Sequence, residues 1–249
     1  MSSIRCIDVS KTFATQGGEE FKALQDVNLE IADKEIVCII GSSGGGKTTL
    51  LNLIAGLLFP SKGQIFSGDN LVEGPGRDRG VVFQQDSVFM WRTVQQNVGF
   101  GLEMNSVPKQ QRNETVARYI KMVRLEEFAN FYPKELSGGM KKKVQLATVL
   151  ANKPQVLLMD EPYGSLDYPT KCELQRELLR VLAEIPTTTI FVTHDIEEAL
   201  YLADRIICIR GGRVTRIVEV PFNRPREEAL RMSLEMTKLK QELWNELEN

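Results

Sequence analysis

The feature that most constrains this chain is a glycine-rich segment between an apolar strand and a helix. Residues 36–40 form a continuous apolar run, and residues 41–48 follow it with the pattern G-x-x-x-x-G-K-[ST]. Glycines let backbone N–H groups converge on an anion, and the next helix turns its positive end toward the same point. The setting predicts a phosphate loop for ATP, with a chance glycine turn as the alternative. The expected nucleotide-binding residues are Gly41, Ser42, Ser43, Gly44, Gly45, Gly46, Lys47, Thr48 and Thr49.

Short apolar runs alternate with helical patterns along the rest of the chain. Such runs are typical of strands buried on both faces of a parallel sheet. Strands that alternate with helices, such as residues 170–184, indicate the α/β fold class. Two alternating runs near the start indicate a smaller, antiparallel β subdomain. The parallel strands are expected at residues 81–83, 156–159, 190–192 and 206–209 besides 36–40, and the antiparallel ones at 4–9 and 27–31.

One stretch of the chain has helical patterns only. These patterns are clearest at residues 94–104 and 109–123. We predict a single domain over residues 1–249. Its parts are a catalytic core (1–84 and 153–225), a helical insert (85–152) and a C-terminal helix (226–249). That last helix has Leu230, Leu234, Leu239, Leu243 and Leu247 at near-helical spacing, so it either docks on its own domain or binds a partner.

Polar residues at other strand ends complete the expected chemistry. Asp160 ends a strand and should hold Mg²⁺ together with Thr48, while Glu161 would serve as the general base that activates water. An Asp-Glu pair at a strand end could also be a solvated turn, but the phosphate loop upstream favours catalysis. His194 is the only histidine and also follows a strand. A single histidine is often structural, although α/β sheets bind ligands beside such strand ends.

Composition excludes several classes of protein. The net charge is −2, so no global basic field marks a nucleic-acid binder. No apolar run reaches the length of a transmembrane helix, and the start lacks an export signal. The four cysteines have no metal-like or redox-like spacing. We expect a cytoplasmic protein that, if it serves a membrane, does so as a peripheral subunit.

A second glycine motif, Leu136-Ser137-Gly138-Gly139, lies before a predicted helix over residues 140–151. Ser137 suits the N-cap, and the glycines leave room for an anion. Lys141, Lys142 and Lys143 crowd the same helix start, where positive charge is unfavourable. A bound phosphate would relieve the conflict, and it would come from a second copy of the chain. The alternative is an ordinary capped helix with a solvated lysine run.

The order phosphate loop, Leu-Ser-Gly-Gly, Leu-Leu-Met-Asp-Glu resembles the ATP-binding subunits of ABC transporters over nearly the whole chain. The resemblance implies a P-loop NTPase (RecA-like) core that uses ATP and Mg²⁺. It implies that two copies close on two ATP molecules, with Ser137, Gly138 and Gly139 of one facing the phosphate bound by the other.

The same resemblance assigns roles to single residues. His194 would contact the γ-phosphate. Gln84 would contact Mg²⁺ or the attacking water and link the nucleotide to the membrane partner. Asp167 lies in a loop that would couple the two half-sites. Phe13 would stack on adenine, with core packing as the alternative.

Several stretches resemble the nitrate, sulfonate and taurine importer branch: residues 82–86, 91–94, 97–98, Met140 and 221–226. The branch implies transmembrane permease subunits, a second ATPase subunit (the same or a related chain) and, indirectly, a solute-binding protein. It places the chain on the cytoplasmic face of the inner or plasma membrane. The apolar residues Phe89, Met90 and Trp91 would line the groove for a permease helix. Against the usual pattern of ABC proteins, the chain departs at Met90, Met140, the lysines after it, Thr148-Val149 and Ser165, although Met at position 140 is familiar in this branch.

Two other functions have weaker support in the sequence. ABC ATPases that act on DNA or ribosomes usually carry coiled-coil insertions, zinc motifs or two cassettes, and this sequence has none. A regulatory protein with a binding-only site would not need intact Lys47, Asp160, Glu161 and His194. The sequence does not identify the transported substrate.

Overall fold

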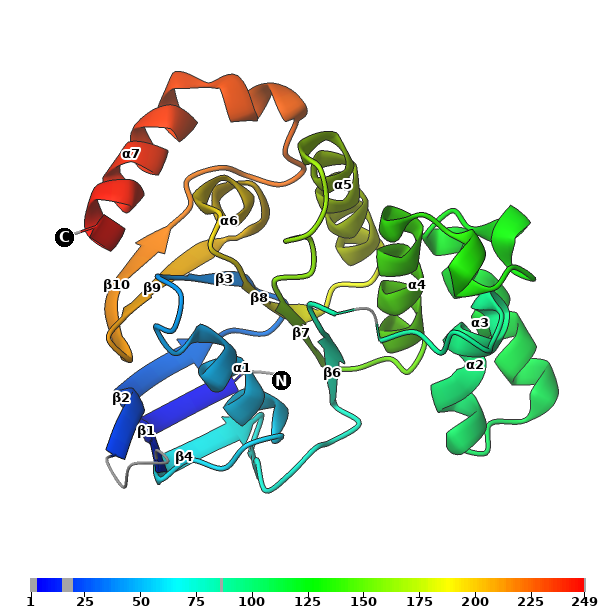
Figure 1. Ribbon diagram of the computed structural model, residues 1–249, viewed down its shortest axis with the longest axis horizontal. Helices are drawn as coiled ribbons and strands as arrows, with labels where there is room; N and C mark the ends of the chain where they lie inside the picture. The colour runs from blue at the N-terminus through cyan, green and yellow to red at the C-terminus, as the bar shows by residue number, and fades with distance from the viewer. Residues whose placement is uncertain (1–3, 15–19, 86, 249) are drawn as a thin grey trace.

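A six-stranded sheet forms the centre of the fold (Figure 1). The computed structural model describes residues 4–14, 20–85 and 87–248. Asp86, which belongs to the branch pattern, lies outside the described residues. The strand order is β10-β9-β3-β8-β7-β6, and only β10 runs antiparallel to its neighbour. The bounds are β3 (Ile36–Ile40), β6 (Arg79–Val82), β7 (Val156–Asp160), β8 (Thr188–Val192), β9 (Arg205–Arg210) and β10 (Arg213–Glu219).

The central strands are buried on both faces, as their continuous apolar runs predict. In β3, Cys38 packs in one buried cluster, whereas Val37 and Ile39 pack in the other. Successive side chains of a strand point to opposite faces, so one run serves two layers. Helix α1 (Lys47–Ala55) lies in one layer; α5 (Tyr168–Glu184) and α6 (Ile196–Leu202) lie in the other. The α/β class is therefore confirmed.

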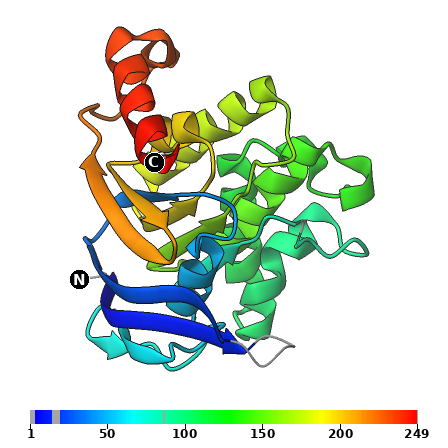
Figure 2. The same cartoon turned by 60° about the vertical axis from the view of Figure 1, so that its left-hand side comes forward.

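A four-stranded antiparallel sheet packs beside α1, in the order β2-β1-β4-β5. Its strands are β1 (Ile4–Ala14), β2 (Glu20–Ile31), β4 (Lys62–Ser67) and β5 (Asn70–Leu71). Figure 2 shows this sheet as a layer of its own below the six-stranded sheet. The strands expected at residues 4–9 and 27–31 are confirmed, while β4, β5 and β10 were not predicted.

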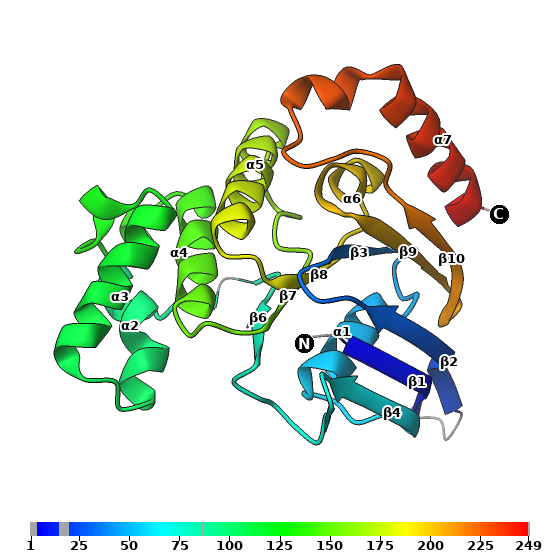
Figure 3. The ribbon, with the colours of Figure 1, turned by 180° about the vertical axis from the view of Figure 1, so that it is seen from behind.

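The segment between β6 and β7 contains α2 (Val94–Met104), α3 (Lys109–Met122), α4 (Gly138–Leu150) and two short 3-10 turns. No strand occurs in its described residues, 87–152, as expected. Figures 1 and 3 both place these helices together, on the far side of β6 from α1. The division of the chain into a catalytic core, a helical insert and a C-terminal part stays a prediction.

Some predicted boundaries are wrong. The strand expected at 81–83 ends at Val82, and Phe83 is 40% exposed because the chain leaves the sheet there. The C-terminal helix does not begin at residue 226: a 3-10 segment (Glu228–Met232) precedes α7 (Leu234–Glu248). The guanidinium of Arg226 is buried and donates to the carbonyl oxygens of Leu200, Tyr201, Ala203 and Phe222, which holds this stretch as a loop.

Helix α7 docks on its own domain. Met236 and Leu243 are buried in the core, seven residues apart and therefore on one helix face. Leu234 does not belong to that face and is 65% exposed, which corrects its place in the predicted leucine series. No helix in the described part of the chain is long and apolar enough to cross a membrane.

Candidate nucleotide-binding site

Four adjacent strands end at one edge of the central sheet, in the order β3-β8-β7-β6. The phosphate loop follows β3, His194 follows β8, Glu161 follows β7 and Gln84 follows β6. These strands are parallel, so their carboxyl ends open on the same side, where α/β sheets bind ligands. Residues about 150 positions apart in the sequence therefore converge on one place.

The phosphate loop is shaped by close backbone contacts. Gly46 has a φ of 102°, and a Cβ there would strike the carbonyl oxygen of Ala23. Lys47 is buried, and its ammonium donates to the carbonyl oxygens of Gly41 at 2.9 Å and Ser42 at 3.0 Å. Burial lowers the pKa of Lys47, whereas Glu161 and Asp160 raise it. The lysine charge thus lies inside the loop, beside two carboxylates.

Thr48 and Asp160 join the start of α1 to the end of β7. The Thr48 hydroxyl donates to Oδ1 of Asp160 at 3.1 Å. Burial raises the pKa of Asp160, and the Thr48 hydrogen bond opposes that rise. Mg²⁺ in nucleotide enzymes takes a few protein oxygens and completes its shell with phosphate and water. A hydroxyl and a carboxylate at this spacing fit that donor set.

Glu161 and His194 face each other across β7 and β8. His194 Nδ1 lies 3.2 Å from Oε2 of Glu161. Glu161 has a φ of 41°, a conformation uncommon for residues other than glycine, and its N–H donates to the carbonyl of Val192 at 2.9 Å. His194 is exposed, so an incoming molecule can reach it. A backbone strained like that of Glu161 often marks a functional position.

A buried carboxylate that the sequence did not single out supports this pair. Glu198 accepts from the Thr193 hydroxyl at 2.6 Å, and the same hydroxyl accepts from the N–H of Asp195 at 3.0 Å. Burial raises the pKa of Glu198, and the Thr193 hydrogen bond opposes it. The two bonds fix the chain on either side of His194.

Gln84 lies close to the Glu161 loop. A Cβ built on Gly164 would lie 3.7 Å from Nε2 of Gln84 and 3.8 Å from Oε2 of Glu161. The Gln84 side chain and the Glu161 carboxylate therefore approach the same space. No distance to a nucleotide follows from this, so the role of Gln84 stays a prediction.

The second glycine motif lies elsewhere in the molecule. Ser137 caps α4, since its hydroxyl accepts from the N–H of Met140 at 3.3 Å. Gly138 and Gly139 lie against Leu166 and Thr170, next to the Asp167 loop. Helix α4 is separated from α1 by β6 in Figures 1 and 3. The structure therefore places the two glycines of this motif beside the loop that contains Asp167, and β6 lies between this region and α1.

Asp167 itself is the N-cap of α5. Its carboxylate accepts from the N–H of Thr170 at 3.2 Å and from the hydroxyl of the same residue at 2.8 Å. These hydrogen bonds lower the pKa of Asp167. The loop thus has a local structural reason for its aspartate, and its predicted part in coupling remains untested.

The solvated-lysine interpretation of the α4 start is wrong. Lys142 is 5% exposed, and its ammonium donates to the main-chain carbonyl of Gln84 at 2.6 Å. Lys143 pairs with Glu173 at 2.8 Å. The sequence predicted that the lysines at the α4 start have unfavourable surroundings. It did not predict their partners, because the Gln84 carbonyl and Glu173 lie on other elements.

Phe13 is partly buried and belongs to neither buried cluster of the described residues. Its ring lies 5.1 Å from the Lys11 ammonium, and its strand partner is Phe21, which is 51% exposed. The core-packing alternative is therefore not supported. Stacking on adenine stays a prediction, with Phe21 as a neighbouring aromatic that the sequence did not single out.

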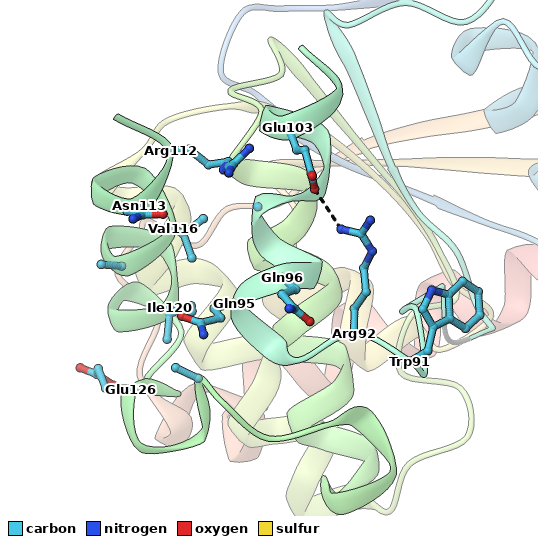
Figure 4. A pocket seen from close by; sticks show the side chains of 13 residues that line it. Trp91, Arg92, Gln95, Gln96, Glu103, Arg112, Asn113, Val116, Ile120 and Glu126 are labelled. Carbon is cyan, nitrogen blue, oxygen red and sulfur yellow. Dashed lines mark hydrogen bonds and ion pairs between the residues drawn. The ribbon is translucent and has the colours of Figure 1, made fainter. Parts of the chain in front are cut away.

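A cavity of about 890 Å³ opens between α2 and α3 (Figure 4). Trp91 stands at its edge and is 73% exposed, and Arg92 pairs with Glu103 at 3.0 Å on the α2 side of the cavity. Phe89 is held by ring contacts to Phe100 and Trp91. Of the three residues expected to line a groove, Met90 and Trp91 are exposed, while Phe89 is partly buried.

Comparisons with known proteins agree with this geometry. The family model described as ABC transporter matches residues 24–164. The chain is 45% identical to an uncharacterized ABC transporter ATP-binding protein of Methanocaldococcus jannaschii, over 93% of this chain and 86% of the relative. It is 43% identical to a nitrate import ATP-binding protein of Synechocystis (89% and 83% covered) and 41% identical to a taurine import ATP-binding protein of Roseobacter denitrificans (89% and 84%).

A solved structure also matches. It is a dimeric, post-hydrolysis state of an ATP-binding cassette bound to ADP and Pi, with a TM-score of 0.78 and 33% identity. The alignment covers 88% of this chain and all of that one. The likeness confirms the P-loop NTPase fold.

Proposed function

Because this chain belongs to the ABC transporter family, we propose that it is the motor subunit of an importer for a small anion such as nitrate, sulfonate or taurine. Family membership makes it an ATP-binding subunit and an ATPase. One observation carries the catalytic assignment: the ends of β3, β8, β7 and β6 bring the phosphate loop, His194, Glu161 and Gln84 to one edge of the sheet.

Each residue at this edge has a proposed task. The loop N–H groups and Lys47 bind the β- and γ-phosphates, and Thr48 and Asp160 hold Mg²⁺. Mg²⁺ supplies charge neutralisation and orientation of the phosphates when bound. Glu161 accepts a proton from the attacking water, while His194, 3.2 Å from that carboxylate, positions the γ-phosphate and the water. Gln84 contacts the same site from β6.

We propose that a second ATPase subunit completes the site. Ser137, Gly138 and Gly139 begin a helix that lacks acidic residues in its first turn, a setting that suits an anion. In the same chain they lie against Leu166 and Thr170. A phosphate held by a partner copy is therefore their proposed ligand, as in a dimer that closes on two ATP molecules.

The proposed membrane partner is a permease subunit that docks on the α2–α3 surface. The cavity beside Trp91 offers an exposed aromatic edge and the Arg92–Glu103 pair, which suits a short helix with one apolar face. With such a partner, the chain would be a peripheral subunit on the cytoplasmic face of the membrane. A solute-binding protein would belong to the same system.

The catalytic assignment is tested with Glu161→Gln. Removal of a positioned base lowers the rate about 10²–10⁴-fold, and the variant should accumulate as an ATP-bound dimer. ATP hydrolysis and size-exclusion chromatography with ATP and Mg²⁺ measure the two effects. Glu219→Gln, at an exposed position of β10, is the control and should hydrolyse at the parent rate. Hydrolysis by Glu161→Gln at that rate would refute the role of Glu161.

The importer assignment is tested by purifying the tagged chain from detergent-solubilised host membranes. A polytopic membrane protein should co-purify, and Trp91→Ala should weaken that association without lowering the basal ATPase. Recovery of soluble nucleic-acid or ribosomal partners alone would refute a transport function. Unchanged assembly and transport-linked ATPase in Trp91→Ala would refute the docking surface only.

A further inference from the structure

Two cations of the C-terminal segment, residues 228–248, contact the first turn of α6. The Arg231 guanidinium donates to Oε1 of Glu197 at 3.2 Å, and the Lys240 ammonium donates to Oε2 at 3.0 Å. Glu197 is three residues after His194. Figures 1 and 3 both show the segment next to α6. The segment therefore holds the chain just after His194.

Arg231 has a second contact that leads to the other side of His194. Its guanidinium donates to Oε1 of Gln175 at 2.5 Å, and Nε2 of Gln175 donates to Oε1 of Glu198 at 3.1 Å. The other oxygen of Glu198 accepts from the hydroxyl of Thr193, the residue before His194. Gln175 and Glu198 are 2% and 5% exposed, so this path is buried. One guanidinium is thus connected to the residues on both sides of His194.

The Arg231 contacts resist displacement for a physical reason. Its side chain is 7% exposed, and the guanidinium carbon lies 3.7 Å from the centre of the Tyr201 ring. A buried cation that loses an acceptor costs free energy, because no water takes the place of that acceptor. Burial raises the pKa of Glu197, but hydrogen bonds from Tyr168 and Lys240 outweigh it, and the pKa lies below its ordinary value. Glu197 therefore keeps its charge, and the pair stays intact, at neutral pH.

His194 depends on such support because its own side chain is 58% exposed. Packing does not orient an exposed imidazole, so its position follows from the backbone on either side. A catalytic group must be held within about 0.5 Å of its productive position by the residues around it. The distance of 3.2 Å between the imidazole and the Glu161 carboxylate is therefore sensitive to movement of either flanking residue.

We propose that Arg231 is a positioning residue for His194. By holding Glu197 on one side and Gln175 on the other, it fixes the loop that brings the imidazole to Glu161. The C-terminal segment, which lies outside the residues that the family model matches, thereby supports ATP hydrolysis. The inference rests on the proposed function, because it requires that His194 acts on the γ-phosphate and the attacking water.

The first test compares full-length Arg231→Met with Arg231→Lys. Methionine fills much of the space without the charged donors, whereas lysine keeps one charge that can reach Glu197. Arg231→Met should lower kcat about tenfold, within the cost of a misplaced catalytic group, and leave the KM for ATP within about twofold, because the phosphate loop is untouched. Arg231→Lys should recover about threefold of that loss, since one charged contact remains.

The second test observes His194 directly. It is the only histidine of the sequence, so untagged protein labelled with ¹³C-histidine gives a single imidazole ¹H–¹³C correlation. That signal should shift in Arg231→Met and return toward the parent position in Arg231→Lys. The spectra are recorded without nucleotide, so this readout does not depend on activity.

Arg176→Met is the matched control. Arg176 pairs with Glu228 at 3.2 Å, so it also joins α5 to the C-terminal segment, but both side chains are more than half exposed. Arg176→Met should change kcat by less than about twofold and leave the His194 signal in place. If Arg231→Met does not fold, Lys240→Met removes the more exposed of the two cations on the α6 carboxylate and should show the same pattern, with kcat about threefold lower.

The two readouts together decide the proposal. A lower kcat with a shifted His194 signal supports it. Parental kcat in Arg231→Met would overturn it, and so would a lower kcat with an unmoved signal, because the loss would then arise elsewhere. Losses without any recovery in Arg231→Lys would overturn it too, since Arg231 would then serve packing alone. Failure of the proposed function would look different: His194→Ala would hydrolyse ATP at the parent rate, wherever the signal lies in the Arg231 variants.

Discussion

Helices α1 and α4 both begin at glycine-rich segments with lysines nearby, yet the two starts have different surroundings. Neither helix has an acidic residue in its first turn. The start of α1 has no side-chain cap and lies against the ends of β7 and β8, where Thr48 bonds to Asp160. The start of α4 is capped by Ser137 and packs on Leu166 and Thr170. The difference supports a nucleotide site with two halves. One half is the α1 start of one chain, and the other half is the α4 start of a second copy.

The largest expected effect comes from the α1 start. Lys47→Met removes the charge aimed at the transferring phosphoryl group and should lower ATP hydrolysis about 10³-fold. Phosphate release measures the rate, and equilibrium dialysis measures the affinity for ATP. Lys62→Met, at an exposed position on β4, should leave both unchanged. A Lys47→Met rate above one tenth of the parent rate would contradict the assigned role of α1.

The α4 start is tested next, by Ser137→Asp. Aspartate caps helices as well as serine does and interacts favourably with their positive end, so the midpoint of thermal unfolding should not fall. A carboxylate where a phosphate should bind is expected to lower hydrolysis about 10²-fold. The measurements are thermal unfolding by circular dichroism and steady-state ATPase. Parental activity would mean that no anion binds at this helix start.

Mixing the two variants tests the comparison itself. Co-expressed Lys47→Met and Ser137→Asp chains should form mixed dimers in which one of the two sites has both intact halves. Random pairing then predicts about a quarter of the parent activity. A mixture that shows only the average of the two separate variants would refute a site shared between copies.

A smaller effect is expected of Ser137→Ala, which separates the cap from the charge. Loss of the hydroxyl that accepts from Met140 should destabilise the protein by about 1 kcal/mol. Hydrolysis should fall less than with aspartate, since no repulsive charge is introduced. Urea unfolding and the ATPase assay measure the two changes. An alanine variant as inactive as the aspartate variant would assign the effect to the hydroxyl instead.

The smallest expected effect concerns Glu198, which holds the β8 end beside His194. Its pKa is raised above the ordinary 4.5, chiefly by burial, so the folded protein binds this proton more tightly than the unfolded chain does. The stability that it contributes is present below pH 4.5 and is lost as pH rises through the raised pKa. Glu198→Gln should therefore gain stability relative to the parent as pH rises to neutrality. Urea unfolding across that pH range measures the gain, and parallel stability curves would contradict it.

The predictable part of the site is local. The phosphate loop, the strand before it and Asp160-Glu161 at a strand end were all predicted, because glycine conformation and apolar runs act over a few residues. The strands β4, β5 and β10 were missed, since each is short or exposed and lacks a strong apolar pattern. The leucine spacing of the C-terminal helix placed its start too early, because the buried Arg226 is held by the carbonyl oxygens of Leu200, Tyr201 and Ala203, which lie 23 to 26 positions earlier in the sequence.

The sequence by itself determined the α/β class, the family resemblance and the residue types at the strand ends. The tertiary structure decided which strand ends are neighbours, and that Lys142 binds the Gln84 carbonyl instead of water. That bond joins residues 58 positions apart, and Glu161 meets His194 only because β7 and β8 pair. Local patterns report on the conformation of a few residues. Contacts between distant elements depend on how the whole core packs, and the packing alone brings these groups within bonding distance.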